Sequence, residues 1–289
     1  MPTRRFYLHR ATNRLIEGAI IAAFLAIGAA DSLATPITVD SEVVIMIDIS
    51  GSIDAIEMAT QWQGWGDAIA ELGAEGAFTS GPQGKVALGF GVFSTLPFGP
   101  PVYYLVDSPA VANTIRDDML GLITTGLGAT NVGGAIGVAA ASFETNNYDS
   151  PVQIICVSGD GISNFGPDTL TMRNSALAAG VERINGLYIV GDPQNPIDQL
   201  KSFYETEVAG GEGAFVSGVA TGHTELGLFK EAIKQHLGFT LNSNLYSPPP
   251  DAVFVVPEPS GVMSAFIGSA GLICWLWRRE RRLPSNLEL

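Results

Sequence analysis

The sequence predicts an α/β protein with a doubly wound, mostly parallel central sheet, helices on both faces and one antiparallel edge strand. First, residues 43–47 are five apolar, largely β-branched residues, which is typical of a strand buried on both faces of a parallel sheet. Second, such runs alternate along the chain with segments of helical periodicity. Third, two predicted strands, 85–94 and 102–106, are joined by a short proline-rich connection, which indicates an antiparallel edge hairpin.

The first half of the domain contains these three strands and two predicted helices. After the strand 43–47, apolar residues recur at spacings of four and three, which predicts one buried helix face with polar residues such as Gln61 lying off it. A glycine-rich loop at 73–84 precedes the hairpin, and a second helix is predicted at 111–122. The buried face of the first helix comprises Met58, Trp62, Trp65, Ile69 and Leu72.

The second half continues the alternation of helix and strand. The predicted helices lie at 132–143, 168–179, 197–208 and 225–237, and the predicted strands at 151–157, 184–190 and 214–216. The last helix is expected to turn four apolar residues inward, namely Leu226, Phe229, Ile233 and Leu237. Residues 241–255 include three consecutive prolines and are predicted to be a linker, so the folded domain spans about 40–240.

The first 34 residues have the composition of a signal peptide. A basic segment precedes thirteen uncharged residues, 18–30, and small residues suit cleavage at either Ser32 and Ala34 or Gly28 and Ala30. The alternative is an uncleaved membrane anchor, but thirteen residues are fewer than the roughly 20 of a spanning helix. We therefore expect export, with cleavage by signal peptidase.

The other end of the chain contains an uncharged stretch, 261–277, that is just long enough to span a bilayer. The stretch ends in Trp275 and Trp277, and four arginines follow it, which favours a cytoplasmic location for the tail 283–289. Because both basic ends favour the cytoplasmic side, we expect the domain between them to lie across the membrane.

The sequence Val-Pro-Glu-Pro-Ser directly precedes this stretch. Pro257, Glu258 and Pro259, followed by one apolar helix and an arginine cluster, resemble the PEP-CTERM sorting signal of Gram-negative bacteria over residues 256–282. The resemblance implies transient anchoring in the inner membrane, cleavage near the Pro-Glu-Pro by an exosortase, and release or attachment at the cell surface. The alternative is a C-terminal anchor that is never cut.

The part of the chain between the two ends is strongly acidic. Residues 35–255 hold 7 basic and 24 acidic side chains, a net charge of about −17. This charge argues against a nucleic-acid partner and against unaided binding to anionic lipid, and it favours attraction of divalent cations. The two cysteines, Cys156 in an apolar run and Cys274 in the terminal helix, are not expected to pair, so a hydrophobic core must hold the domain together.

Oxygen-bearing side chains stand where three segments lead into loops or helices. Asp48, Ser50 and Ser52 follow the first strand, Thr130 lies in a glycine-rich loop at the start of a helix, and Asp160 follows another apolar strand. If the strands are parallel neighbours, the three loops open on one edge of the sheet. Hard oxygen ligands without His or Cys suit Mg²⁺, or Mn²⁺ or Ca²⁺, rather than zinc.

The alternative is that these residues serve as helix caps and turn formers. For any one of them that interpretation is the better one, but five in register at strand ends favour a metal site. Thr124 and Thr125 are alternatives to Thr130, and they lie further from the start of the helix.

The motifs themselves resemble those of a known family. D-x-S-x-S at 48–52, G-A-T-N-V-G-G-A-I at 128–136 and D-G at 160–161 resemble the metal ion-dependent adhesion site (MIDAS) of von Willebrand factor A (vWA) domains. The resemblance covers about residues 40–240 and is to a bacterial subfamily of these domains. It implies a Rossmann-like fold in which Ser50, Ser52 and Thr130 coordinate the metal directly, while aspartates act largely through water.

The function implied by the resemblance is metal-bridged adhesion to an acidic group of a protein or polysaccharide, not turnover. The alternatives are a metal-dependent hydrolase on the same fold and a structural matrix component with a vacant site. No zinc-protease motif or phosphate-binding P-loop occurs in the sequence. Of the histidines, His9 lies in the signal peptide, and His223 and His236 are expected on the solvated surface at the last helix.

Overall fold

The computed structural model has two units, residues 1–37 and 38–289. It describes residues 35–97, 99–122, 128–191, 194–219 and 225–255. The predicted signal peptide, the sorting motif Pro257-Glu258-Pro259 and the predicted spanning stretch 261–277 lie outside these residues. Within the described part, no helix has the length and apolar character needed to cross a membrane.

The second unit is built on one mixed sheet whose central strands are parallel. In spatial order the strands are β10 (Val253–Phe254), β9 (Phe215–Val219), β7 (Arg183–Ile189), β6 (Gln153–Gly159), β2 (Glu42–Asp48), β3 (Val86–Phe93) and β4 (Val102–Val106). Five neighbours from β9 to β3 run parallel, and β4 pairs antiparallel with β3 at one edge. The predicted fold class and its antiparallel edge hairpin are therefore confirmed.

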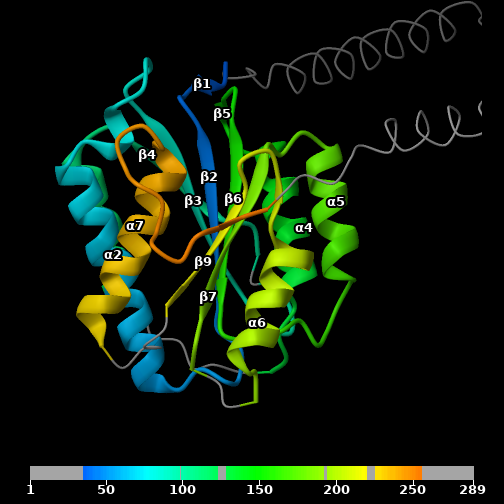
Figure 1. Cartoon of the computed structure of the whole chain (residues 1–289). Helices are drawn as coiled ribbons and strands as arrows, with labels where there is room; N and C mark the ends of the chain where they lie inside the picture. The colour runs from blue at the N-terminus through cyan, green and yellow to red at the C-terminus, as the bar shows by residue number, and fades with distance from the viewer. Residues whose placement is uncertain (1–34, 98, 123–127, 192–193, 220–224, 256–289) are drawn as a thin grey trace, which may run out of the picture. The chain divides into compact units, whose positions relative to one another are not determined.

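Helices cover both faces of this sheet (Figure 1). One face carries α2 (Ala55–Ala74), α3 (Pro109–Leu120) and α7 (Leu226–Leu241), and the other carries α4 (Val132–Phe143), α5 (Thr169–Ala178) and α6 (Ile197–Phe203). The central strand β2 is buried along its whole length. Because side chains alternate along a strand, it contributes to the hydrophobic cores on both faces of the sheet. Val43, Ile45 and Ile47 pack on the α2 side, and Val44 and Met46 on the α4 side.

The apolar face predicted for α2 is buried as expected, including Trp62 and Trp65. Glycine lets α7 approach this helix closely, since a Cβ placed on Gly64 would lie 2.4 Å from the Phe229 ring. On α7 itself, Phe229, Ile233 and Leu237 are buried, whereas Leu226 is only half-buried at the first turn.

The prediction for His236 is wrong. Its side chain is fully buried on the inward face of α7, where Nδ1 lies 2.8 Å from Ser217 Oγ and the ring packs 4.7 Å from that of Phe215. The reason is helical periodicity, because residue 236 follows the buried Phe229 by seven positions and Ile233 by three. Burial lowers the pKa of His236 to about 3. His9 and His223 lie outside the described residues.

Several boundaries differ from those expected. α2 continues to Ala74, inside the predicted glycine-rich loop, and a short 3₁₀ helix, η1 (Ala77–Thr79), follows it. The helix predicted at 197–208 changes after Phe203 into a π-helix, η2 (Tyr204–Val208). Three further strands are two residues long, and a strand this short leaves no periodic signal; they are β1 (Ile37–Thr38), β5 (Tyr148–Asp149) and β8 (Gly210–Gly211).

The stretch 241–255, which the sequence predicts to be a linker, contributes a strand to the sheet. β10 pairs antiparallel with β9, so the sheet has a second antiparallel edge that the sequence does not predict. Asp251 supports this packing, because its Oδ2 accepts a 2.6 Å hydrogen bond from the Gly218 backbone N–H. Cys156 lies buried in β6 as a free thiol, and burial raises its pKa to about 12.

Candidate metal centre

The site lies where the order of the parallel strands reverses. From β2 the chain passes through α2 to β3 on one side, whereas β6 on the other side of β2 leads through α5 to β7. In doubly wound sheets, the crevice at the carboxyl ends of the two strands flanking this reversal is the usual ligand-binding position. Asp48 is the last residue of β2, and Asp160 directly follows β6. The topology alone therefore brings the two carboxylates to this crevice.

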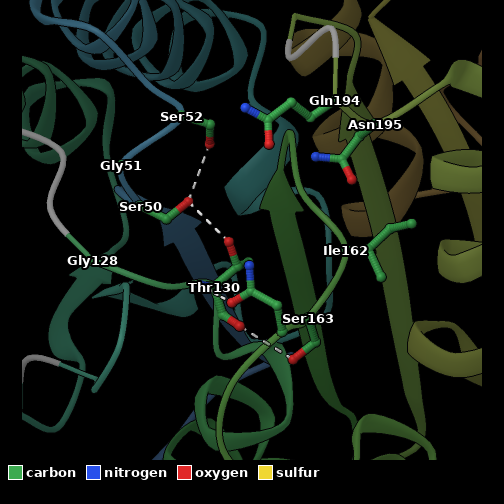
Figure 2. Close-up of a pocket in the computed structure, with 10 residues that line it drawn as sticks. Ser50, Gly51, Ser52, Gly128, Thr130, Ile162, Ser163, Gln194 and Asn195 are labelled. Atoms are coloured by element: carbon green, nitrogen blue, oxygen red, sulfur yellow. Dashed lines mark hydrogen bonds between the residues drawn. The ribbon is translucent and has the colours of Figure 1, made fainter.

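Three hydroxyls link the loops that meet there. Thr130 Oγ1 donates to Ser50 Oγ at 3.1 Å, and Ser50 Oγ lies 3.3 Å from Ser52 Oγ. Ser52 Oγ in turn donates to Asp160 Oδ1 at 2.8 Å. Figure 2 shows the hydroxyls of Ser50, Ser52 and Thr130 pointing toward one another. The side chains predicted from three separate segments thus form one connected group, with Asp48 directly beneath Ser50.

Hydrogen bonds to the backbone hold the first loop in place. The Ser50 N–H donates to Asp48 Oδ1 at 2.8 Å, which turns the chain sharply after β2. Gln61 Nε2 donates to the Asp48 carbonyl at 3.0 Å, so this glutamine is buried in α2 rather than lying on its polar side. The prediction for Gln61 is therefore wrong, because a polar residue is tolerated in the core when it satisfies a buried carbonyl.

The second loop is fixed by residues that the sequence does not mark as part of the site. Asn164 Oδ1 accepts the Thr130 N–H at 2.9 Å, and Thr95 Oγ1 accepts the Ala129 N–H at 2.9 Å. The Asn131 side chain caps α4 by accepting the Gly134 N–H at 2.8 Å. Thr130 itself is therefore free of a capping role and presents its hydroxyl to Ser50. Thr124 and Thr125 lie outside the described residues.

The hydroxyls of Ser50, Ser52 and Thr130 face a polar hollow of about 540 Å³. Ser50, Ser52 and Thr130 line one side of it, and the amide side chains of Gln194 and Asn195 lie across from them (Figure 2). Asn164 also lines the hollow. Among the described residues that line the hollow there is no lysine, arginine or histidine. Ser50, Thr130 and Asp160 are at most 5% exposed, whereas Ser52 is exposed at the mouth.

The electrostatics of Asp48 are unusual for a carboxylate. Burial, followed by the negative charge of Asp160, raises the pKa of Asp48 to about 7. Its Oδ1 is satisfied by the Ser50 N–H, but its buried Oδ2 has no hydrogen-bond partner among the described residues. Two buried carboxylates lie close together here, and the described residues that line the hollow include no basic side chain, so a divalent cation bound at the hydroxyls would offset their negative charge.

The donor set fits a hard cation. Two carboxylates and three hydroxyls offer only oxygen, which suits Mg²⁺, Mn²⁺ or Ca²⁺ and leaves coordination positions for water. Within the described residues no group of three or more His, Cys, Asp or Glu side chains is placed to hold a metal. Binding at this site would therefore depend on the hydroxyls of Ser50, Ser52 and Thr130 as much as on the carboxylates.

The family of the chain follows from a match over most of the domain. A family model described as "Protein of unknown function (DUF1194)" matches residues 38–244. The chain belongs to this family. The match contains all five predicted site residues and every helix described above. No protein with a curated description matches the chain.

Comparison with solved structures finds similar proteins, all at low sequence identity. The pilus adhesin SpaC from Lactobacillus rhamnosus GG, in its open conformation, superposes with a TM-score of 0.51 at 12% identity, over 71% of this chain and 30% of SpaC. Proximal thread matrix protein 1 from the mussel byssus, with a zinc-occupied MIDAS motif, has a TM-score of 0.48 at 18% identity, over 71% of this chain and 50% of the matrix protein. A von Willebrand factor type A protein from Catenulispora acidiphila has a TM-score of 0.46 at 16% identity, over 70% of this chain and 43% of that protein.

This chain therefore spans half or less of the length of these proteins. The likeness to SpaC supports the doubly wound fold.

Proposed function

We propose that this protein is an exported vWA-type binding protein that grips an acidic group of its ligand through a divalent metal at a MIDAS-type site. The observation that carries the proposal is the connected group of Thr130, Ser50, Ser52 and Asp160 at the strand reversal. Asp48 Oδ2 lies buried beside this group and has no hydrogen-bond partner in the described part of the chain. A helix cap or turn needs none of these contacts between loops, so their convergence favours a bound cation over a purely structural role.

In this proposal Ser50, Ser52 and Thr130 hold the metal directly, and Asp48 and Asp160 orient water molecules bound to it. When bound, Mg²⁺, Mn²⁺ or Ca²⁺ supplies an electrophilic centre with an exchangeable coordination position. Because the direct ligands are neutral hydroxyls and the two carboxylates act only through water, the metal can still accept an acidic group of the ligand as a direct ligand. The amides of Asn164, Gln194 and Asn195 line the hollow beside this position, where they can donate N–H groups to the second oxygen of a ligand carboxylate.

The proposed location is the cell surface or extracellular matrix of a Gram-negative bacterium. Signal peptidase would remove the first segment, and an exosortase would act at Pro257-Glu258-Pro259 after transient anchoring in the inner membrane by residues 261–277. The ligand is then a protein or polysaccharide met outside the cytoplasm, which agrees with the acidic, cation-attracting body of the chain. SpaC, which shares the fold, is a pilus adhesin, and we carry surface binding over to this chain on that basis.

A chelator-controlled capture experiment tests the proposal. The purified protein is immobilised and exposed to solubilised cell-envelope material in Mg²⁺ buffer, and bound material is then eluted with a chelator. We expect wild-type protein to retain a partner that the chelator releases, and Ser50→Ala to retain none. Ser175→Ala serves as the matched control, since Ser175 is an exposed serine of α5 that hydrogen-bonds within its own helix. Binding of the same partner that survives the chelator would contradict the proposal.

A further inference from the structure

Tyr204 is a fully buried tyrosine on the α4 side of the sheet, and its hydroxyl has no hydrogen-bond partner among the described residues. It begins the π-helix η2, a departure from regular helix that often marks a functional position. Two glycines make room for the side chain, because a Cβ on Gly186 would lie 2.7 Å from Tyr204 Cδ1, and one on Gly159 would lie 2.9 Å from its hydroxyl. The ring therefore lies across β7 and reaches the end of β6.

The hydroxyl of Tyr204 and the Oδ2 of Asp48 both lie close to Gly159. A Cβ on Gly159 would lie 2.8 Å from Asp48 Oδ2 and 2.9 Å from the Tyr204 hydroxyl, so these two atoms are at most about 5.7 Å apart. Both are buried polar atoms without a partner in the described part of the chain. Native proteins rarely leave such atoms unsatisfied, and one buried water with two hydrogen bonds of about 2.8 Å can join two atoms whose separation is within this limit.

We propose that Tyr204 is a positioning residue of the metal centre, whose hydroxyl holds the Oδ2 of Asp48 through one buried water seated over Gly159. Oδ1 is then held by the Ser50 N–H and Oδ2 by Tyr204, which fixes the plane of the carboxylate beneath the hydroxyls. The inference rests on the proposed function. It adds Tyr204 to the residues of the metal centre. Tyr204 lies 156 positions after Asp48 in the sequence and on the opposite face of the sheet from α2.

A role in packing alone would need the ring but not the hydroxyl. The ring packs with Phe203 at 5.6 Å and Tyr188 at 6.3 Å between centroids, and a phenylalanine would keep those contacts. Burial and the charges of Asp48 and Asp160 raise the pKa of Tyr204 well above its ordinary value, so the hydroxyl remains a donor at neutral pH. The hydroxyl, rather than the ring, therefore distinguishes positioning from packing.

The test compares Tyr204→Phe with wild-type protein by titration calorimetry with Mg²⁺ and Mn²⁺, together with denaturant unfolding of metal-free protein. We expect metal affinity to fall about tenfold or more, as for other residues that orient metal ligands. We expect the free energy of unfolding of the metal-free protein to change little, since the ring contacts remain and only one water-mediated hydrogen bond is lost. Tyr188→Phe, which removes a hydroxyl from the neighbouring ring, should leave metal affinity unchanged.

A second variant tests the position of the water. Gly159→Ala places a methyl group 2.8 Å from Asp48 Oδ2 and 2.9 Å from the Tyr204 hydroxyl, which leaves no room for a water between them. It should therefore also weaken metal binding, and its effect should not add to that of Tyr204→Phe. Equal metal affinity of wild type and Tyr204→Phe, or strictly additive effects of the two changes, would overturn the positioning role while leaving the proposed function intact. Absence of metal uptake by wild-type protein would instead overturn both.

Discussion

Ser52 and Asp160 are separated by 108 residues in the chain, yet Ser52 Oγ donates a 2.8 Å hydrogen bond to Asp160 Oδ1. This contact joins the loop after β2 to the loop after β6 across the reversal of the sheet. Because one partner is an exposed hydroxyl and the other a buried carboxylate, the bond closes the candidate site on its open side. In the proposed metal-bound state, the Ser52 hydroxyl would coordinate the metal in place of this hydrogen bond to Asp160.

This geometry predicts that Ser52→Ala weakens metal binding much more than it weakens the fold. One hydrogen bond at an exposed hydroxyl contributes only about 1 kcal/mol to the free energy of unfolding. Loss of a direct ligand should lower the affinity for Mn²⁺ at least about tenfold. Calorimetric titration and urea unfolding of the same preparations measure the two effects. A variant that binds Mn²⁺ like wild type would exclude Ser52 as a ligand.

The raised pKa of Asp48 predicts a pH dependence for the metal-free protein. Its pKa is about 7 in the folded protein and near 3.8 otherwise, so between these values the folded state binds more protons at this residue than the unfolded state does. The contribution of Asp48 to stability is therefore fully present at low pH and is lost as pH rises from about 4 to about 7. Mg²⁺ should offset the loss at pH 7.5 and have little effect at pH 4.5.

The measurement is urea unfolding of wild type and Asp48→Asn across this range without metal. Other carboxylates titrate in both proteins, so the difference between the two isolates Asp48. We expect the stability of wild type relative to Asp48→Asn to fall by up to about 1.4 kcal/mol per pH unit. A difference that stays level, or that grows with pH, would mean that Asp48 is not held in a destabilised ionised form.

His236 predicts a dependence of the opposite sign. Burial lowers the pKa of His236 to about 3, so between pH 3 and pH 6.5 this histidine is protonated in the unfolded state and neutral in the folded state. The contribution is fully present above pH 6.5 and is lost as pH falls toward 3. Stability of wild type relative to His236→Gln should therefore decrease on acidification. An NMR titration in which the His236 ring protonates near pH 6.5 in the folded protein would contradict this.

Two glycines on neighbouring helices predict opposite changes in stability. Gly64→Ala would place its methyl group 2.4 Å from the Phe229 ring, so it should separate α2 from α7 and cost about 1–3 kcal/mol. Gly227→Ala, at the start of α7, meets no atom within 4 Å and should be neutral or stabilising by up to about 1 kcal/mol. Thermal unfolding of both variants measures the contrast. Equal changes in stability for the two variants would show that Gly64 is not needed for the close approach of α7 to α2.

The central elements could be predicted from the sequence because their signals are local. The apolar run of β2 and the four-three spacing on α2 reflect burial that each segment undergoes in any doubly wound fold. The five oxygen-bearing residues stand at the ends of such segments, and the topology of the sheet then brings them together. Whether they bind metal remains a prediction.

The features that the sequence did not predict depend on contacts between distant segments. Gln61 is buried because it reaches the Asp48 carbonyl, and Asn164 belongs to the site because it accepts the Thr130 N–H. Neither pairing leaves a periodic pattern, since polar residues on a helix or in a loop are most often solvated. The strand β10 and the position of Tyr204 were missed for the same reason, as both are defined by the partner segment rather than by their own sequence.

Metal uptake is the measurement that tests the central claim most directly. Calorimetric titration of the purified, metal-free protein with Mg²⁺ and Mn²⁺ at pH 7.5 should give one saturable site. The site should be lost in Asp48→Ala and in Ser50→Ala, both with the circular dichroism spectrum of wild type, and retained in Ser175→Ala. Absence of uptake by wild type at millimolar metal, or undiminished uptake by Asp48→Ala, would contradict the account.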